Sequence, residues 1–175
     1  MSQRAKQTNH PLPEALTFRI VTYLNAFRLL INVGLLYAFY AGLMSSSQSS
    51  ETYDLTGTVL ISYTIMAGFL AFESRRRSAH AFFLARATLF TDVFFLSILL
   101  FVFGGLANGV IILLMFTSAA AAILLPLRLA LFIASLVILV FFGKATRGIL
   151  LYDEPLTTLV AASLYGLTIF GIALL

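Results

Sequence analysis

The sequence predicts an all-α, polytopic membrane protein with six transmembrane helices and both termini in the cytoplasm. Hydrophobic residues occupy 61% of its 175 positions and charged residues only 10%, whereas about a quarter of the residues in a soluble domain are charged. The apolar residues also gather into six runs separated by short polar segments. A water-soluble fold could not bury this much apolar surface, so we expect the chain to cross a bilayer six times.

The placement of basic residues predicts the orientation of these spans. Nine of the eleven Lys and Arg residues fall on one predicted side of the membrane, and only Lys144 and Arg147 fall on the other. Because cytoplasmic segments retain Lys and Arg during insertion, the side with nine is predicted to face the cytoplasm of a bacterial inner membrane. The net charge of +4 therefore reflects orientation and contact with membrane lipids rather than binding to nucleic acid. The nine residues are Arg4, Lys6, Arg19, Arg28, Arg75, Arg76, Arg77, Arg86 and Arg128.

Residues 1–19 are predicted to form a cytoplasmic tail, in which Pro11 and Pro13 disfavour helix before about Glu14. The first span is predicted at residues 20–44. This run is longer than the apolar core of a cleaved signal peptide, which has about 7 to 15 residues, so we interpret it as a retained anchor.

The remaining spans are placed by the polar and Gly-rich segments between them. We expect external loops at residues 45–54 and 143–155, and a cytoplasmic loop at 73–86 whose second half, from Ala79, forms a short interfacial helix. Spans three to five are shorter than the roughly 20 residues that cross a bilayer, so they are expected to borrow turn residues or thin the membrane locally. The spans are predicted at residues 55–72, 87–103, 110–125, 129–142 and 156–175, so that residues 20–175 form one six-helix domain.

Small residues predict where helices approach each other, since backbones in lipid come close only where side chains are small. Gly34, Ala38 and Gly42 recur every four positions along the first span. Residues 118–122 (SAAAA) make the fourth span thin on all sides, which favours a central position. These surfaces are expected to pack within the chain or, alternatively, to contact a second copy or a partner helix.

Two ionisable residues, Arg28 and Asp92, fall inside predicted spans. A charge within the hydrocarbon region costs several kcal/mol unless it is paired or hydrated. Both residues lie at a similar depth from the cytoplasmic ends of their spans, so we predict an intramembrane ion pair between spans one and three. The pair is expected either to lock the two helices together or to take part in signalling. Further hydrogen bonds are expected from Asn25, Asn32, Thr88 and Thr91.

The turn at residues 104–109 (GGLANG) is the most distinctive short motif. Paired glycines followed by Asn-Gly permit a tight reversal of the chain, because these residues tolerate positive φ. The backbone amides of the turn are also a candidate binding site for a carbonyl-bearing ligand such as a quinone head group. The candidate ligand-binding residues are Gly104, Gly105, Asn108 and Gly109.

The sequence contains no pattern of catalytic or metal-binding residues. It has no cysteine, and its two histidines, His10 and His80, have no second histidine or carboxylate at metal-ligand spacing. Neither histidine is followed by the acidic residue that marks a kinase phosphoacceptor, so both are interpreted as solvated loop residues. No phosphate-binding loop or nucleophile elbow occurs in the chain. We therefore predict no catalytic residue, no metal and no resident cofactor among these residues.

Four features follow one another between residues 92 and 139: the acidic Asp92 in span three, a Gly-Gly turn, the small residues 118–122 and a Leu-Leu-Pro-x-Arg turn. In this order they resemble the membrane sensor region of type IV pilus two-component sensor histidine kinases, the PilS family. Arg28 within AFRLL fits the same pattern. The turn residues are Gly104 and Gly105, then Leu124, Leu125, Pro126 and Arg128.

The resemblance implies that the chain is the signal-sensing membrane region of a histidine kinase, acting as a homodimer. It also implies a cytoplasmic kinase region, absent from these 175 residues, that uses ATP and magnesium to phosphorylate a cognate response regulator. The sixth span ends at Leu175 without basic residues to hold it in the cytoplasm, which indicates a fragment. Members of the family regulate pilin production, so a pilin transmembrane helix is the expected partner.

Two other functions remain open from the sequence. The turn also resembles the GGLxNP-type turn of RegB-like redox sensor kinases, which is linked to quinone, although Gly109 stands where that family has proline. A small transporter with Asp92 as its proton or ion site is the third possibility, but such proteins usually have inverted repeats, and none is evident here.

Overall fold

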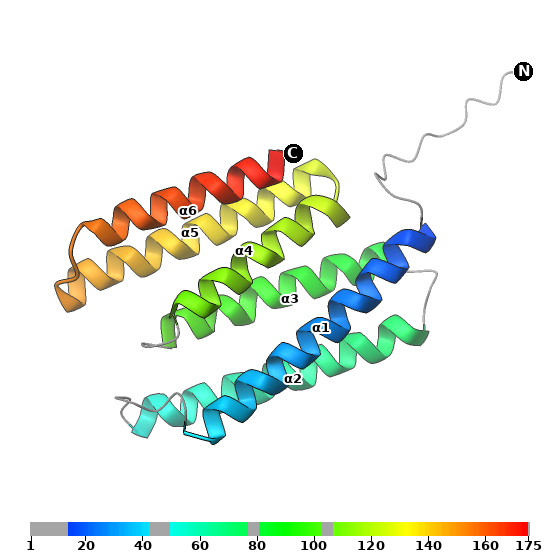
Figure 1. Ribbon diagram of the computed structural model, residues 1–175, viewed down its shortest axis with the longest axis horizontal. Coiled ribbons are helices and arrows are strands. Elements are labelled where there is room, and N and C mark those ends of the chain that lie inside the picture. The colour runs from blue at the N-terminus through cyan, green and yellow to red at the C-terminus, as the bar shows by residue number, and fades with distance from the viewer. Residues whose placement is uncertain (1–13, 43–49, 77–80, 103–106, 175) are drawn as a thin grey trace, which may run out of the picture.

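The computed structural model describes residues 14–42, 50–76, 81–102 and 107–174 (Figure 1). These ranges contain six α-helices and no strand, which confirms the predicted all-α class. Five of the helices are long and apolar enough to cross a membrane, and the apolar part of the fourth is shorter. The helices are α1 Glu14–Tyr40, α2 Ser50–Arg76, α3 Ala81–Val102, α4 Ala107–Leu124, α5 Leu127–Tyr152 and α6 Thr157–Leu174.

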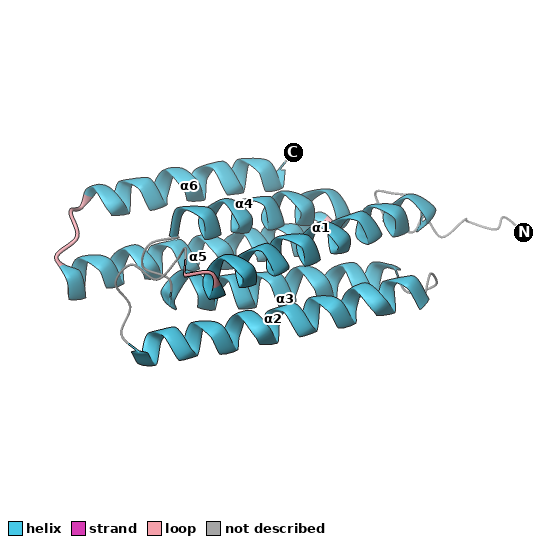
Figure 2. Cartoon of the chain, turned by 60° about the horizontal axis from the view of Figure 1, so that its bottom comes forward, coloured by secondary structure: helices cyan, strands magenta, loops and turns pink. Residues whose placement is uncertain are grey.

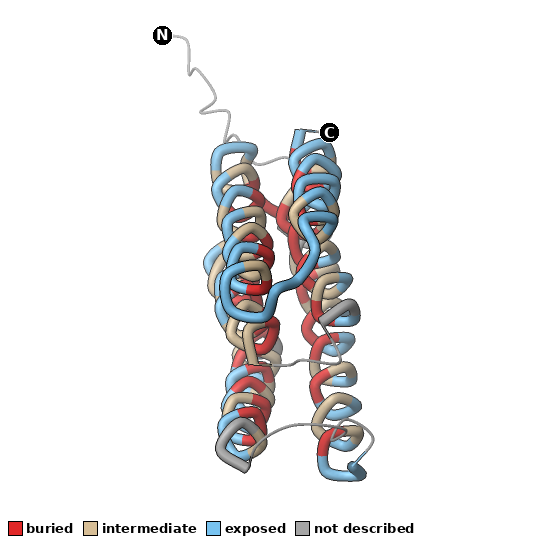
Figure 3. The backbone as a smooth tube through the Cα atoms, turned by 90° about the vertical axis from the view of Figure 1, so that its left-hand side faces the viewer, coloured by how far each residue is buried: buried red, intermediate tan, exposed pale blue. Residues whose placement is uncertain are grey.

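The helices form three consecutive antiparallel hairpins, α1 with α2, α3 with α4, and α5 with α6 (Figure 1). In two further views they lie in two layers, one made of α1, α4 and α6 and the other of α2, α3 and α5 (Figures 2 and 3). Each hairpin therefore contributes one helix to each layer. Helix α1 begins and α6 ends at the same end of the bundle, as an even number of spans requires (Figure 1).

The core lies between the two layers, where buried residues line the facing sides of the helices (Figure 3). The central hairpin supplies much of it: Leu89, Leu99 and Leu100 of α3 and Leu114 of α4 are fully buried. Ser118 and Ala121 of α4 are also fully buried, and α4 contacts α3, α5 and α6. The small residues of the fourth span therefore lie where three neighbouring helices converge.

The fifth helix differs most from the sequence-based expectation. Its span is predicted at residues 129–142 with an external loop at 143–155, but α5 continues as helix to Tyr152. Lys144 and Arg147 suggested a loop, yet their long aliphatic stems can follow the helix surface while the charges reach the head-group region. The buried Ala145 and Gly148 continue the packing face of α5 through this segment.

The third helix is also longer than predicted, because α3 begins at Ala81 and runs through Arg86 without a break. The first turns that were expected to form a separate interfacial helix belong to the span itself. Helices α3 and α5 contain 22 and 26 residues, so they need not thin the bilayer, and only the apolar segment Gly109–Leu124 is short. Helix α2 likewise begins at Ser50, inside the predicted loop 45–54.

The first helix begins at Glu14, directly after the two prolines that were expected to delay it. Its predicted small-residue face is not an internal packing surface, because a Cβ atom added at Gly34 would meet nothing within 4 Å. The face that α1 turns inward carries Val21, Asn25, Arg28 and Asn32 instead. The predicted tail up to residue 13 and the first half of the predicted external loop, residues 45–49, lie outside the described ranges.

Candidate functional site: a buried polar cluster

Three polar side chains lie at the same depth in three different helices. Arg28, Tyr63 and Asp92 are each the eleventh residue of their apolar segments, Phe18–Tyr40, Tyr53–Ser74 and Phe82–Val102. All three are buried, with Asp92 3% and Tyr63 2% exposed. Since a charge is most costly near the middle of a membrane span, these residues must be stabilised by each other.

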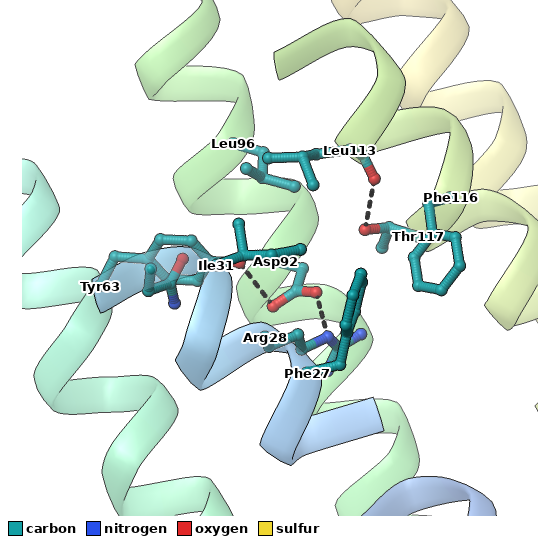
Figure 4. A pocket seen from close by; sticks show the side chains of 10 residues that line it. Phe27, Arg28, Ile31, Tyr63, Asp92, Leu96, Leu113, Phe116 and Thr117 are labelled. Carbon is teal, nitrogen blue, oxygen red and sulfur yellow. Dashed lines mark hydrogen bonds and ion pairs between the residues drawn. The ribbon is translucent and has the colours of Figure 1, made fainter. Parts of the chain in front are cut away.

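The carboxylate of Asp92 on α3 is the centre of the cluster (Figure 4). Arg28 Nε of α1 lies 2.5 Å from Asp92 Oδ2, and the Tyr63 hydroxyl of α2 donates a 2.9 Å hydrogen bond to Asp92 Oδ1. Each carboxylate oxygen therefore has its own partner from a different helix. Because α1 lies in one layer and α2 and α3 in the other, the ion pair connects the two layers (Figures 2 and 4).

The inward face of α1 positions the arginine. Asn25, Arg28 and Asn32 follow at spacings of three and four residues, which bring side chains to one face of a helix. Arg28 Nη1 lies 3.5 Å from Asn25 Oδ1, a long hydrogen bond within the helix. This face of α1 is polar while its opposite face is apolar: Tyr23 and Leu30 are more than 70% exposed. In a membrane this inverted pattern directs the polar side chains toward the protein.

The cluster is not fully satisfied. Asn25 Nδ2, Arg28 Nη2 and Asn32 Nδ2 are buried without a hydrogen-bond partner among the described residues. Arg28, Asn32, Tyr63 and Asp92 also line a cavity of about 20 Å³, which is room for about one water-sized group. These unpaired N–H donors, together with the small cavity, offer the Asp92 carboxylate alternative hydrogen-bond partners.

Aromatic and small polar residues enclose the cluster. The Tyr63 ring stacks on Phe95 of α3 with centroids 5.1 Å apart, and Phe27 of α1 packs against Phe116 of α4 at 5.4 Å. Thr117 of α4 also lines the cavity, while its hydroxyl donates to the carbonyl of Leu113 in its own helix (Figure 4). All of the first four helices thus contribute to one site.

The structure brings together Arg28 and Asp92, and it places Asn25 and Asn32 beside them. Thr88 is different, because its hydroxyl donates to the carbonyl of Leu84 in the same helix. Sequence reasoning missed Tyr63 altogether. A phenolic hydroxyl in the middle of an apolar span requires a partner as a charge does, so its position was the signal that could have revealed it.

The second candidate site, the GGLANG turn, is only partly described. Gly104 and Gly105 lie outside the described ranges, whereas Asn108 and Gly109 belong to the first turn of α4. The backbone at residues 107–109 is thus helical rather than part of a wider loop. The proposed role of this turn in ligand binding remains a prediction.

Comparison with known proteins agrees with this architecture. A family model described as a PilS-like transmembrane domain matches residues 11–175, nearly the whole chain. Neither the curated proteins nor the solved structures contain a match to this chain.

Proposed function

This chain belongs to the family of PilS-like transmembrane domains, the membrane sensor region of a kinase, and we propose that it senses a partner within the bacterial inner membrane to control type IV pilin expression. In this proposal the chain works as a homodimer. A cytoplasmic kinase region beyond these residues uses ATP and magnesium to phosphorylate a cognate response regulator. The expected partner is the transmembrane helix of pilin.

The observation that carries the proposal is the cluster of Arg28, Tyr63 and Asp92. It joins the two helical layers through a single carboxylate at the middle of the spans. Breaking or exchanging one of its contacts changes how α1 packs on α2 and α3, and small shifts between packed helices are a common form of transmembrane switching. The unpartnered donors of Asn25 and Asn32 provide alternative partners during such a shift.

A binding partner can act on this switch from the membrane. The outer face of α1 is apolar and exposed, and Gly34 has open space where a side chain would otherwise extend. A helix that packs on this face at close range gains van der Waals contact along α1. Its binding energy is then available to rotate or shift α1 against the other layer.

The test introduces the substitutions Asp92→Asn and Tyr63→Phe into the full-length protein in its source organism. Both changes alter the contacts of the cluster without adding bulk, so we expect normal membrane insertion but altered autophosphorylation and altered pilin transcript levels. Tyr152→Phe is the matched control, because this tyrosine is 64% exposed at the end of α5, outside both the cluster and the outer face of α1. Unchanged output in both cluster variants would leave the cluster with a structural role only.

The partner is tested separately by photocrosslinking from Leu30 and Tyr37, which are exposed on α1. We expect crosslinks to pilin from these positions and none from the buried Val21. A crosslink pattern that avoids α1, or no pilin adduct at all, would reject this face as the pilin contact.

The two alternative functions, a transporter and a quinone sensor, predict different properties for Asp92 and for the 104–109 turn. A transporter that used Asp92 as its ion site would need a free carboxylate, whereas both oxygens here have protein partners. A quinone-responsive sensor would exchange quinone at the 104–109 turn. Quinone retained by the purified chain and lost on Asn108→Ala would favour this alternative over the pilin sensor.

A further inference from the structure

A second cavity lies far from the polar cluster, at the end of the bundle opposite the start of α1. It has a volume of about 280 Å³, is open on one side, and is lined mainly by residues of α3, α4, α5 and α6. Its inner wall is apolar and includes Leu100, Ile111 and Phe141. Its polar lining includes Lys144 of α5, Glu154 after α5, and Tyr165 of α6.

Lys144 and Glu154 line this cavity without forming an ion pair with each other, because Arg28 with Asp92 is the ion pair found in the described part of the chain. A cation and an anion that are exposed to one cavity but not paired leave room for a group between them. Such a group satisfies both if it offers an acceptor at one end and a donor at the other.

The end of α5 holds Glu154 in this position. Asp153 caps the helix in the left-handed conformation, with φ of 51°, and its N–H bonds to the carbonyl of Gly148. The N–H of Glu154 donates to the same carbonyl at 3.2 Å. The Glu154 carboxylate then lies against Gly148, where an added Cβ atom would collide with it. The absence of a side chain at residue 148 is what lets the carboxylate fold back toward the helix.

The location of the cavity indicates the source of its ligand. It lies near the end of α3 and the start of α6, so in a bilayer it is at the level of the lipid head groups. Its volume is close to the lower end of the range for small-molecule sites, about 300–1,000 Å³, which suits a head group rather than a whole lipid. The opposite charges of its lysine and glutamate give no net attraction for an anionic lipid.

We propose that this cavity binds the head group of a zwitterionic phospholipid with a primary amine, of the phosphatidylethanolamine type. The Lys144 ammonium donates to the phosphate, and the Glu154 carboxylate accepts from the lipid ammonium. The apolar wall of Leu100, Ile111 and Phe141 contacts the glycerol and the first methylenes of the acyl chains. This inference does not rest on the proposed kinase function, and its test does not use kinase output.

The test measures lipid binding to the purified chain in detergent by native mass spectrometry, using three lipids with identical acyl chains. We expect phosphatidylethanolamine to bind about three- to tenfold more tightly than phosphatidylcholine, whose methylated amine cannot donate to Glu154. Phosphatidylglycerol lacks the cation and is expected to bind more weakly as well. Equal binding of all three lipids, or tighter binding of phosphatidylglycerol, would overturn the proposal.

Four variants assign the contacts. Lys144→Gln is expected to weaken both zwitterionic lipids, because both carry the phosphate. Glu154→Gln is expected to remove only the preference for the primary amine, and Gly148→Ala to do the same by displacing the carboxylate without changing any charge. Arg147→Gln is the control, since this arginine lies over the Phe101 ring rather than in the cavity lining. The proposal fails if Arg147→Gln weakens binding as much as Lys144→Gln.

Discussion

At the scale of single residues, Asp92 is the centre of the buried polar cluster in the described helices. Its carboxylate accepts from an arginine of α1 and a tyrosine of α2, so three helices depend on one side chain. Removing one member of a buried ion pair leaves an uncompensated charge, whereas removing both leaves a gap that apolar side chains can fill.

This reasoning predicts strong coupling between the two charged residues. Arg28→Met alone or Asp92→Leu alone should destabilise the chain by about 3–5 kcal/mol, while the double variant should lose much less than the sum. The measurement is a double-mutant cycle of reversible unfolding in mixed micelles. Additive losses would mean that the 2.5 Å contact contributes little to stability.

The tyrosine of the cluster should have a smaller effect. Tyr63→Phe removes one hydrogen bond to Asp92 and keeps the ring stacked on Phe95, so we expect a loss of about 0.6–1.7 kcal/mol, as for hydrogen bonds between membrane helices. The same unfolding assay measures it. Tyr37→Phe, which is 72% exposed, should be neutral, and an equal loss from both substitutions would contradict a specific role for Tyr63.

At the scale of elements, the length of α5 is the main correction to the sequence-based expectation. The segment after residue 142 contains two basic residues and two glycines, a composition typical of loops, yet it is helical to Tyr152. Tertiary packing favours the helix, because α5 packs against α6 and Ala145 and Gly148 are buried along the same face as Val137 and Phe141. Local composition alone could not reveal that neighbour.

Alanine substitutions at Gly143 and Gly42 test experimentally which of these positions is helical and which is in a turn. A Cβ atom at Gly143 would make an ordinary 3.5 Å contact with Phe101, so Gly143→Ala should stabilise the chain by up to about 1 kcal/mol through helix propensity. Gly42 lies in the turn that follows α1 and has a φ of 72°, so Gly42→Ala should destabilise the chain. Thermal unfolding compares the two variants, and destabilisation by Gly143→Ala would argue that α5 ends before residue 143.

At the scale of the whole molecule, charge follows the ends of the bundle. Arg19, Arg86 and Arg128 lie in early turns of α1, α3 and α5, and Arg76 ends α2, all at the end where α6 finishes (Figure 1). Lys144 and Arg147 lie in the half of α5 that extends to the opposite end (Figure 1). This separation follows the positive-inside rule along the length of the fold.

The orientation that follows can be tested with reporter fusions. Alkaline phosphatase joined after Asp153 should be active, and the same enzyme joined after Arg76 should be inactive, because only the first site is expected outside the cytoplasm. A cytoplasmic fluorescent protein at the same sites should give the opposite pattern. Reversed activities would invert the orientation while leaving the fold unchanged.

The sequence by itself determined the class of fold, the number of helices and the two charged residues that had to meet. These features follow from the cost of placing polar groups in hydrocarbon, which can be read from composition and position. Only the tertiary structure determined which side chains contact these buried polar groups. It brought Tyr63 to Asp92, turned Gly34 away from the core, and extended α5 past its basic residues. Each of these outcomes depends on contacts between helices distant in sequence. The position of Tyr63 within its span signals that its hydroxyl needs a partner, but it does not identify Asp92 as that partner.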